Sequence, residues 1–150
     1  MASTYNVIAT TTLSSTATNI DFNSISGSYT NLVLIYSINY SVTGANLTLR
    51  FNSDTGTNYS TTTIYGNGTT VYSDKFSNSN WIYTDNYAGT AGEYFTKKID
   101  ILNYSNTTTY KTCLVRSSSA SKEAYANVSL WRSTAAITSV SLINTSGNFQ

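Results

Sequence analysis

Hydrophobic residues fall in short runs along the chain, and two neighbouring runs give the clearest pattern. Residues 32–40 form an apolar run rich in β-branched and aromatic side chains, long enough for a buried strand and too short to span a membrane. After Gly44, residues 47–51 alternate apolar side chains with Thr48 and Arg50, which is the period of two of a half-buried strand. The pattern predicts that these two strands pair antiparallel at the centre of a β-sandwich.

Other strands are predicted wherever apolar or β-branched residues recur between turn signals. The further predicted strands are residues 4–12, 59–65, 69–72, 93–102, 111–116, 124–131 and 138–143, with a short element at 20–25 and a partly ordered strand at 81–87. Turn residues between them predict a tight hairpin at Gly66-Asn67-Gly68 and an Asx-stabilised turn at residues 52–58, with Gly56 in the left-handed conformation. Loops are expected at 76–80, 88–92, 103–109 and 117–121, and a polar tail at 144–150.

Alternation assigns a face to each side chain in two of these strands. In residues 93–102, Lys97 shares one parity with Phe95, Ile99 and Ile101. In residues 124–131, alternation places one set inward and the other outward. The predicted inward set is Ala124, Ala126, Val128 and Leu130, and the outward set is Tyr125, Asn127, Ser129 and Trp131.

The number and spacing of the strands indicate the fold class. About ten short strands separated by turns are typical of an all-β protein, and we expect one antiparallel β-sandwich, jelly-roll-like, in a single domain over residues 1–150. Its predicted core consists of Leu32, Leu34, Tyr36, Leu47, Leu49, Phe51, Ile99, Ile101, Val128, Leu130, Val140 and Leu142.

The composition predicts a surface that carries few charged side chains. Only 10% of the residues are charged, the formal net charge is +1, and Ser, Thr and Asn fill 66 of 150 positions. This balance gives no electrostatic basis for binding nucleic acid or an anionic membrane. The adjacent pair Lys97-Lys98 is interpreted as a solvated strand edge that Lys protects from aggregation. The residues after Met1 lack the pattern of a signal peptide, so synthesis in a cytoplasm is expected.

Candidate chemistry is scarce. The chain has no histidine and one cysteine, Cys113, which lies in an apolar run and is interpreted as a buried hydrophobic residue. Without histidine, the commonest general base and metal ligand is missing, and the acidic residues are dispersed. We therefore expect no catalytic, metal-binding or cofactor-binding residues, and we predict that the protein is not an enzyme.

Aromatic residues are the remaining feature, with 13 Tyr, 2 Trp and 5 Phe. Trp81, Tyr83 and Tyr87 fall on alternate positions, and Tyr125 and Trp131 share the predicted outward face of another strand. These five are the candidate contacts with a glycan or a neighbouring subunit, because such rings stack while their polar tips stay hydrated. The favoured interpretation is that most of the aromatic rings pack in the core or between subunits, and a glycan-stacking platform is the alternative.

Several motifs together resemble a known group of proteins. They are Arg50-Phe51-Asn52 followed by the segment 54–59 (DTGTNY), a central YAGTAG loop, and Trp131 followed by residues 134–138 (TAAIT). Over residues 31–149 the chain resembles small all-β virion proteins of tailed phages, especially phages of aquatic bacteria. This resemblance implies a non-enzymatic particle component and assigns no catalytic residues.

The resemblance leads to an expected role and expected partners. The expected role is a capsid decoration (cement) protein exposed on the particle, in contact with other virion proteins. The alternative is a tail-fibre module that binds host surface glycans. A homotrimer is expected, because three-fold positions are common for both kinds of protein and because the absence of Pro and the low charge leave β edges weakly protected. No cofactor, nucleic acid or membrane partner is expected.

Overall fold

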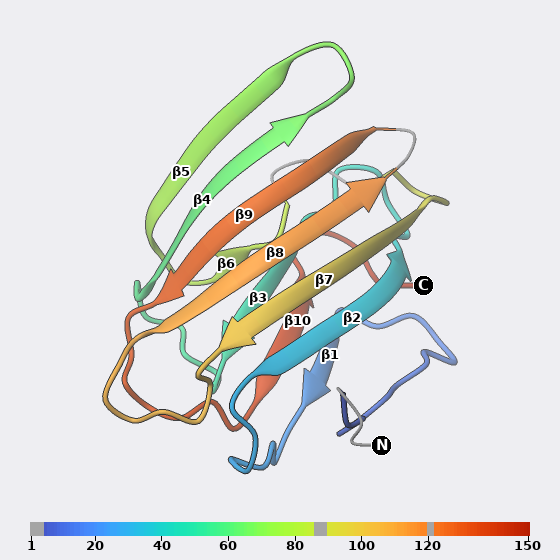
Figure 1. Ribbon diagram of the computed structural model, residues 1–150. Helices are drawn as coiled ribbons and strands as arrows, with labels where there is room; N and C mark the ends of the chain where they lie inside the picture. Colours follow the sequence, from blue (N-terminus) through green and yellow to red (C-terminus); the bar gives the residue numbers. More distant parts are fainter. Residues whose placement is uncertain (1–4, 86–89, 120–121) are drawn as a thin grey trace.

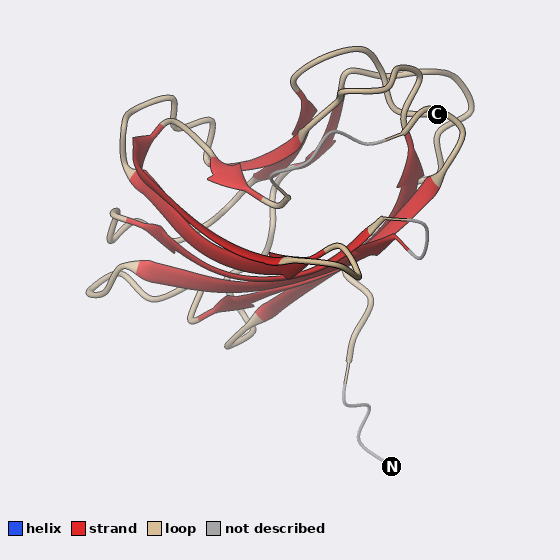
Figure 2. Ribbon diagram, turned by 90° about the horizontal axis from the view of Figure 1, so that it is seen from above, coloured by secondary structure: helices blue, strands red, loops and turns tan. Residues whose placement is uncertain are grey.

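The computed structural model describes residues 5–85, 90–119 and 122–150, and this part of the chain folds into ten strands and no helix. The strands form two antiparallel sheets that pack face to face (Figure 1), which confirms the predicted all-β sandwich. Seen from above, the larger sheet curves around the smaller one (Figure 2). Because the described residues contain no helix, none of them forms a helix that could cross a membrane.

The two sheets contain four and six strands. The four-stranded sheet has the order β1 (Asn19–Phe22), β10 (Val140–Asn144), β3 (Leu47–Phe51), β6 (Ile82–Tyr83). The six-stranded sheet has the order β2 (Leu32–Asn39), β7 (Tyr94–Leu102), β8 (Lys111–Ser119), β9 (Glu123–Trp131), β4 (Tyr59–Gly66), β5 (Val71–Ser79).

The prediction that the strands at 32–40 and 47–51 pair is wrong. β2 pairs with β7, so that Leu32 lies opposite Ile101, whereas β3 pairs with β10 and β6 in the other sheet. The connection between β2 and β3 crosses from one sheet to the other, with Gly44 at a φ of 99°. Two strands that cover one core from opposite sides show the same alternation as two paired strands, so periodicity alone does not separate the two cases.

The core between the sheets contains most of the predicted residues. Those that are buried as predicted are Leu32, Leu47, Leu49, Phe51, Ile99, Ile101, Val140 and Leu142. Leu34 and Tyr36 are partly buried and pack against this core.

The predicted faces of β9 are inverted. Val128 is 47% exposed and Leu130 is half-buried, whereas Tyr125, Asn127, Ser129 and Trp131 are buried. The inward polar side chains are satisfied across the sheet, since Ser129 bonds to Thr61 at 3.0 Å and Thr63 donates to Asn127 at 2.5 Å. Rows of hydrogen-bonded hydroxyls and amides therefore line the interior here, and apolar side chains face outward.

Local differences concern the ends of strands. Residues 5–12 form no strand and are exposed, and the predicted loop at 76–80 instead continues β5 through Ser79. β8 likewise extends through Ser119, into the segment predicted as a loop.

The hairpin at residues 66–68 is confirmed, because β4 pairs with β5 on either side of it. In the turn at 52–58, Asn52 and Ser53 have positive φ rather than Gly56. The predicted polar tail contains the buried Phe149, whose ring lies 6.2 Å from that of Tyr40.

Candidate functional site

A hollow opens beside β5, the last strand of the six-stranded sheet. A short connection leads from β5 to β6, the last strand of the four-stranded sheet. The hollow is lined mostly by hydroxyl and amide side chains, with two aromatic rings and one lysine. The lining residues are Thr55, Thr57, Lys75, Phe76, Ser77, Asn78, Ser79, Asn80 and Tyr83.

Aromatic rings gather on one side of this hollow. The ring centroids of Phe76 and Tyr83 lie 4.4 Å apart, and the edge of Trp81 meets Tyr83 at 6.0 Å. The guanidinium of Arg50 lies over the Trp81 ring at 5.2 Å. All three rings are half-buried, so each keeps some surface for a partner. Sequence reasoning found Trp81 and Tyr83, but it missed Phe76 because that segment was predicted to be a loop.

The wall formed by the turn between β3 and β4 is fixed by the Asp54 carboxylate. This carboxylate accepts hydrogen bonds from the Gly56 backbone N–H at 2.8 Å, the Asn58 amide at 2.9 Å and the Trp131 indole N–H at 2.7 Å. Partial burial would raise the pKa of Asp54, but the hydrogen bonds from Trp131, Asn58 and Gly56 outweigh it and lower that pKa. The turn that presents Thr55 is therefore anchored on the buried Trp131 ring.

Arg132 joins this wall to the opposite one. Its guanidinium donates to the Thr57 carbonyl at 2.8 Å and to the Asn78 side-chain oxygen at 3.2 Å. It also donates to the Ser60 hydroxyl at 3.2 Å. One arginine thus holds the turn and the C-terminal half of β5 in a fixed relation, which makes the hollow a preformed feature of the fold.

The structure separates the five candidate aromatic contacts. Trp81 and Tyr83 lie together beside the hollow. Tyr125 and Trp131 are buried, so the prediction that they face outward is wrong. Trp131 packs at 5.5 Å from Phe51 in the core. Tyr87 lies outside the described residues.

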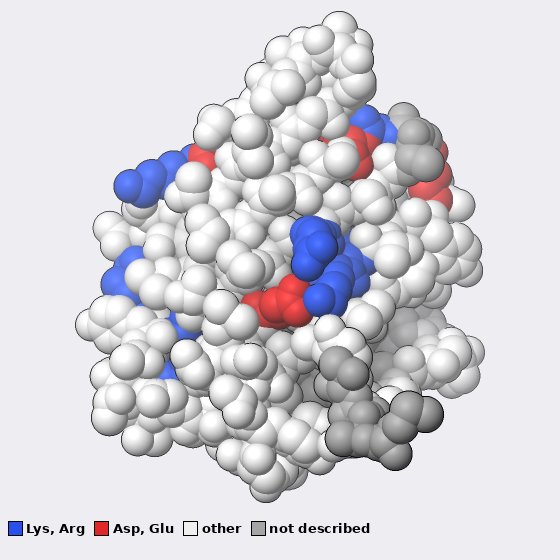
Figure 3. Space-filling view, viewed as in Figure 1, with Lys and Arg blue, Asp and Glu red and all other residues white. Residues whose placement is uncertain are grey.

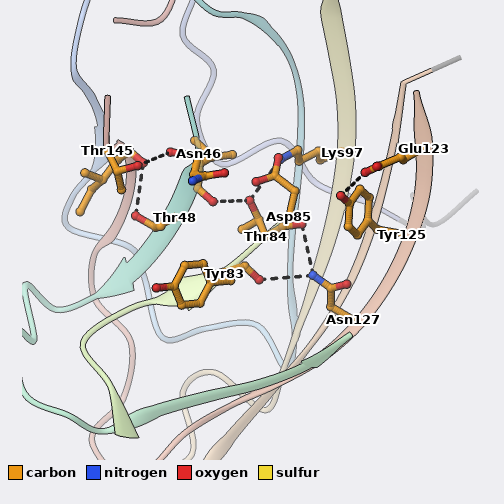
Figure 4. Close-up of polar contacts among 12 residues, drawn as sticks. Asn46, Thr48, Tyr83, Thr84, Asp85, Lys97, Glu123, Tyr125, Asn127 and Thr145 are labelled. Carbon is orange, nitrogen blue, oxygen red and sulfur yellow. Dashed lines mark hydrogen bonds and ion pairs between the residues drawn. The ribbon is translucent and has the colours of Figure 1, made fainter. Parts of the chain in front are cut away.

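A second polar group lies inside the sandwich (Figure 4). Asp85 follows β6 and contacts Lys97 of β7, with side chains that are 4% and 0% exposed. Nζ of Lys97 also donates to the Thr84 hydroxyl at 3.2 Å, and that hydroxyl donates to the Leu47 carbonyl at 2.8 Å. Asn127 donates to the carbonyl of Thr84 at 3.2 Å, which ties β9 to this segment. We call Thr84, Asp85, Lys97 and Asn127 the buried cluster.

The position of Lys97 corrects the interpretation of the Lys97-Lys98 pair. β7 lies between β2 and β8, so Lys97 is not at a sheet edge, and its side chain points into the core with Ile99. Lys98 points outward and pairs with Asp100 at 2.7 Å. The shared parity of Lys97 with Phe95, Ile99 and Ile101 was the signal in the sequence for this burial.

Burial shifts the pKa of both titratable members of the buried cluster toward the neutral form. Burial raises the pKa of Asp85, although the charge and hydrogen bond of Lys97 oppose this change. Burial lowers the pKa of Lys97, although Asp85 opposes it. For both groups the loss of hydration is the largest effect on the pKa. The surroundings therefore favour the neutral carboxylic acid and the neutral amine over their charged forms.

Of the other titratable groups, some are buried singly and others gather around stacked tyrosines, where Tyr65 lies between Tyr72 and Tyr125. Cys113 is buried, as predicted, and burial raises the pKa of its thiol. The Tyr125 hydroxyl, also buried, donates to Glu123. Among the described residues, no three His, Cys, Asp or Glu side chains lie close enough together to hold a metal ion. Comparisons with protein-family models, curated proteins and solved structures found no match to this chain.

Proposed function

We propose that the chain is a non-enzymatic structural protein exposed on the surface of a virion, and that it decorates a capsid. The observation that carries this proposal is the outward face of the six-stranded sheet, which is large, poor in charge and partly apolar. The resemblance of the sequence to virion proteins of tailed phages supplies the identity of the particle. A role in assembly also agrees with the scarcity of catalytic side chains in the sequence, which has no histidine.

The outward face of this sheet is unusual for a solvated surface. Ile35 is 67% exposed, and Ile64, Leu114 and Val128 are also exposed on strands of the same sheet. Leu114 lies directly opposite Val128 across the β8–β9 ladder, so the two side chains make one continuous apolar area. Exposed apolar area of this kind favours packing against another protein.

Charge near the centre of this face is gathered in one place. Figure 3 shows a compact group of basic and acidic side chains near the middle of the view, with uncharged surface directly around it and further charged side chains toward the left and the upper edges. In the compact group, Lys98 and Arg116 contact the Asp100 carboxylate at 2.7 and 3.7 Å. A face with so little net charge can approach a neighbouring protein without strong repulsion or a large cost of desolvation.

The sheet also ends in two strands that could pair further. β2 and β5 are the outer strands of the six-stranded sheet, and the chain has no Pro to protect them. Edge pairing between copies supports the homotrimer that we propose for the decorating unit.

The order of the strands supports a jelly-roll assignment as part of this proposal. In an eight-stranded jelly roll, the first strand pairs with the last, the last with the third, and the third with the sixth. The order β1-β10-β3-β6 matches this arrangement. The order β2-β7-β8-β9-β4-β5 matches the strand order of the second jelly-roll sheet when the three strands β7, β8 and β9 are counted as one strand. Jelly rolls are frequent in viral capsid proteins.

A binding experiment tests the decoration role. Purified protein is added to virus particles that lack it, and the bound amount is measured after sedimentation. We expect saturable binding that Val128→Asp abolishes, because a charge would be buried in the apolar contact. Thr55→Asp is the matched control, since Thr55 is exposed beside the hollow and away from this face. No binding by the wild-type protein, or equal binding by both variants, would refute the proposed surface.

The hollow beside β5 favours one alternative function, a module that binds neutral host glycans. Hydroxyl and amide groups next to half-buried rings are the chemistry that recognises sugars, since the rings stack on the apolar faces of a sugar while polar groups bond to its hydroxyls. Binding of the purified protein to a glycan array tests this alternative. Tyr83→Ala and Trp81→Ala should remove any signal, whereas Tyr94→Ala should not, because Tyr94 is an exposed ring on β7. No signal from the wild-type protein would remove this alternative.

A further inference from the structure

We propose that Lys97 and Asp85 become joined by an amide bond between Nζ of the lysine and Cγ of the aspartate, formed inside the folded chain with release of one water. This modification is independent of the proposed function, because it rests on the buried cluster alone. It would make the pair a covalent cross-link between the two sheets instead of an ion pair.

The first support is the placement of the two reacting groups. Nζ of Lys97 contacts a carboxylate oxygen of Asp85, and neither side chain has access to solvent beyond the 4% exposure of Asp85. Both come from segments that the sheets hold in place. Lys97 lies within β7, and Asn127 fixes the segment before Asp85 through the carbonyls of Tyr83 and Thr84. Two groups held in contact react with the advantage of an intramolecular reaction.

The second support is the medium around the pair. Rings of Tyr40 and Phe95 pack against each other at 5.4 Å in this part of the core, and Tyr36 lies close enough for the Asp85 charge to raise the pKa of its hydroxyl, after burial itself. Water is scarce in such surroundings, which favours condensation over hydrolysis. The same burial favours the neutral acid and the neutral amine, which are the forms that react.

The reaction balances without any further reagent. The lone pair of the neutral Lys97 amine attacks Cγ of the protonated Asp85 carboxyl, and a tetrahedral intermediate forms. One proton moves from the nitrogen to the departing hydroxyl, the Cγ–O bond breaks, and water leaves. The Thr84 hydroxyl, which donates to the Leu47 carbonyl and lies 3.2 Å from Nζ, accepts a hydrogen bond from the nitrogen and so orients it. Each chain reacts only once, so this step is not enzymatic turnover.

The bond would remove an energetic difficulty of the folded state. A buried ion pair recovers only part of the hydration that its charges lose, whereas an amide carries no net charge and needs only hydrogen-bond partners. It would also tie β7 of the six-stranded sheet to the segment that follows β6 of the four-stranded sheet. The two sheets would then stay connected at this point even when their packing is disturbed.

Mass spectrometry of the purified, denatured full chain tests the proposal. We expect the intact mass to be one water lighter than the sequence requires. After trypsin digestion, the loss should lie in one peptide spanning residues 76–98, uncut after Lys97, because an acylated lysine is not a trypsin site. Fragmentation should place the link between residues 85 and 97.

Variants separate this link from other losses of water. Lys97→Arg removes the reacting amine and should restore the full mass, while Lys98→Arg, at the neighbouring surface lysine, should keep the loss. An intact mass equal to that of the sequence for folded wild-type protein would overturn the proposal, and so would a loss of water that maps outside residues 85–97. Because the wild-type mass decides the question, the test stands even if Lys97→Arg fails to fold.

Discussion

The contact between the Trp131 indole and the Asp54 carboxylate allows a quantitative test of how the hollow is built. The indole N–H donates to Asp54 at 2.7 Å, and the Trp131 ring is stacked on Tyr59 at 6.2 Å and packed against Phe51. We predict that Trp131→Phe lowers the free energy of unfolding, and that part of this loss belongs to the hydrogen bond alone.

The size of the effect comes from two contributions. A hydrogen bond to a charged group contributes about 1.5–3 kcal/mol, and the partial exposure of Asp54 places this one at the lower end. The ring atoms lost from a side chain that is only 2% exposed add about 1–1.5 kcal/mol. Trp131→Phe should therefore cost about 2–4 kcal/mol. The coupling between Trp131→Phe and Asp54→Ala should be about 1–2 kcal/mol.

Urea denaturation of the wild type, both single variants and the double variant measures this coupling. Trp81→Phe is the matched control, because the Trp81 indole nitrogen is buried without a hydrogen-bond partner among the described residues. Its replacement should cost less than about 1 kcal/mol, because the smaller ring weakens only the partly exposed contacts with Tyr83 and Arg50. A coupling below about 0.5 kcal/mol would refute the reasoning.

The same coupling should depend on pH in a defined direction. The pKa of Asp54 is lowered in the folded protein, so its contribution to stability is fully present above the unfolded value of about 3.9. The contribution is lost as the pH falls from there through the folded pKa. A coupling that instead grows on acidification would contradict the assigned hydrogen bonds.

Three further predictions concern the core and the backbone. The Cys113 thiol, which is buried with a raised pKa, should not react with a thiol reagent in the folded protein and should react fully in urea; fast native reaction would contradict its position. Leu142→Ala should cost about 2–5 kcal/mol and Val128→Ala less than about 1 kcal/mol in urea denaturation, because only Leu142 faces the core; equal costs would contradict the outward position of Val128 on β9. Gly147→Ala should lower the melting temperature more than Gly68→Ala does. Both glycines have positive φ, which costs an alanine about 1–2 kcal/mol, but only at Gly147 would the added Cβ lie 2.6 Å from a Val42 methyl. Equal melting temperatures would contradict that crowding.

The sequence predicted strands better than it predicted their partners. Alternation is a local property, so the hairpin of β4 and β5 and the strand β7 were found from nearby residues. The pairing of β3 with β10 joins residues about ninety positions apart, and no local pattern encodes it. The same limit made β2 and β3 look like neighbours.

The faces of β9 show a second limit, which comes from the chemistry of the core. A rule that places Ala and Val inward and Asn and Ser outward fails when the interior rows are hydrogen-bonded, as they are for Thr63 with Asn127. The outward Val128 then belongs to the contact surface rather than the core. Burial of Trp131 results from the same inversion.

The candidate sites were predicted only in part. Trp81 and Tyr83 were found by their spacing, and both lie beside the hollow. The shared parity of Lys97 with apolar residues of its strand pointed to its burial. Its contact with Asp85 depends on how the two sheets pack, which the spacing of residues along the sequence does not reveal. Arg132, which joins the two walls of the hollow, carried no signal in the sequence.

Electron cryo-microscopy of virus particles that carry this chain tests the proposed function most directly. We expect density for the sandwich at many equivalent positions over the head, grouped in threes, with the outward face of the six-stranded sheet against the capsid. Density at a few positions on the tail would favour the glycan-binding alternative. Absence of the chain from purified particles would contradict the proposed function.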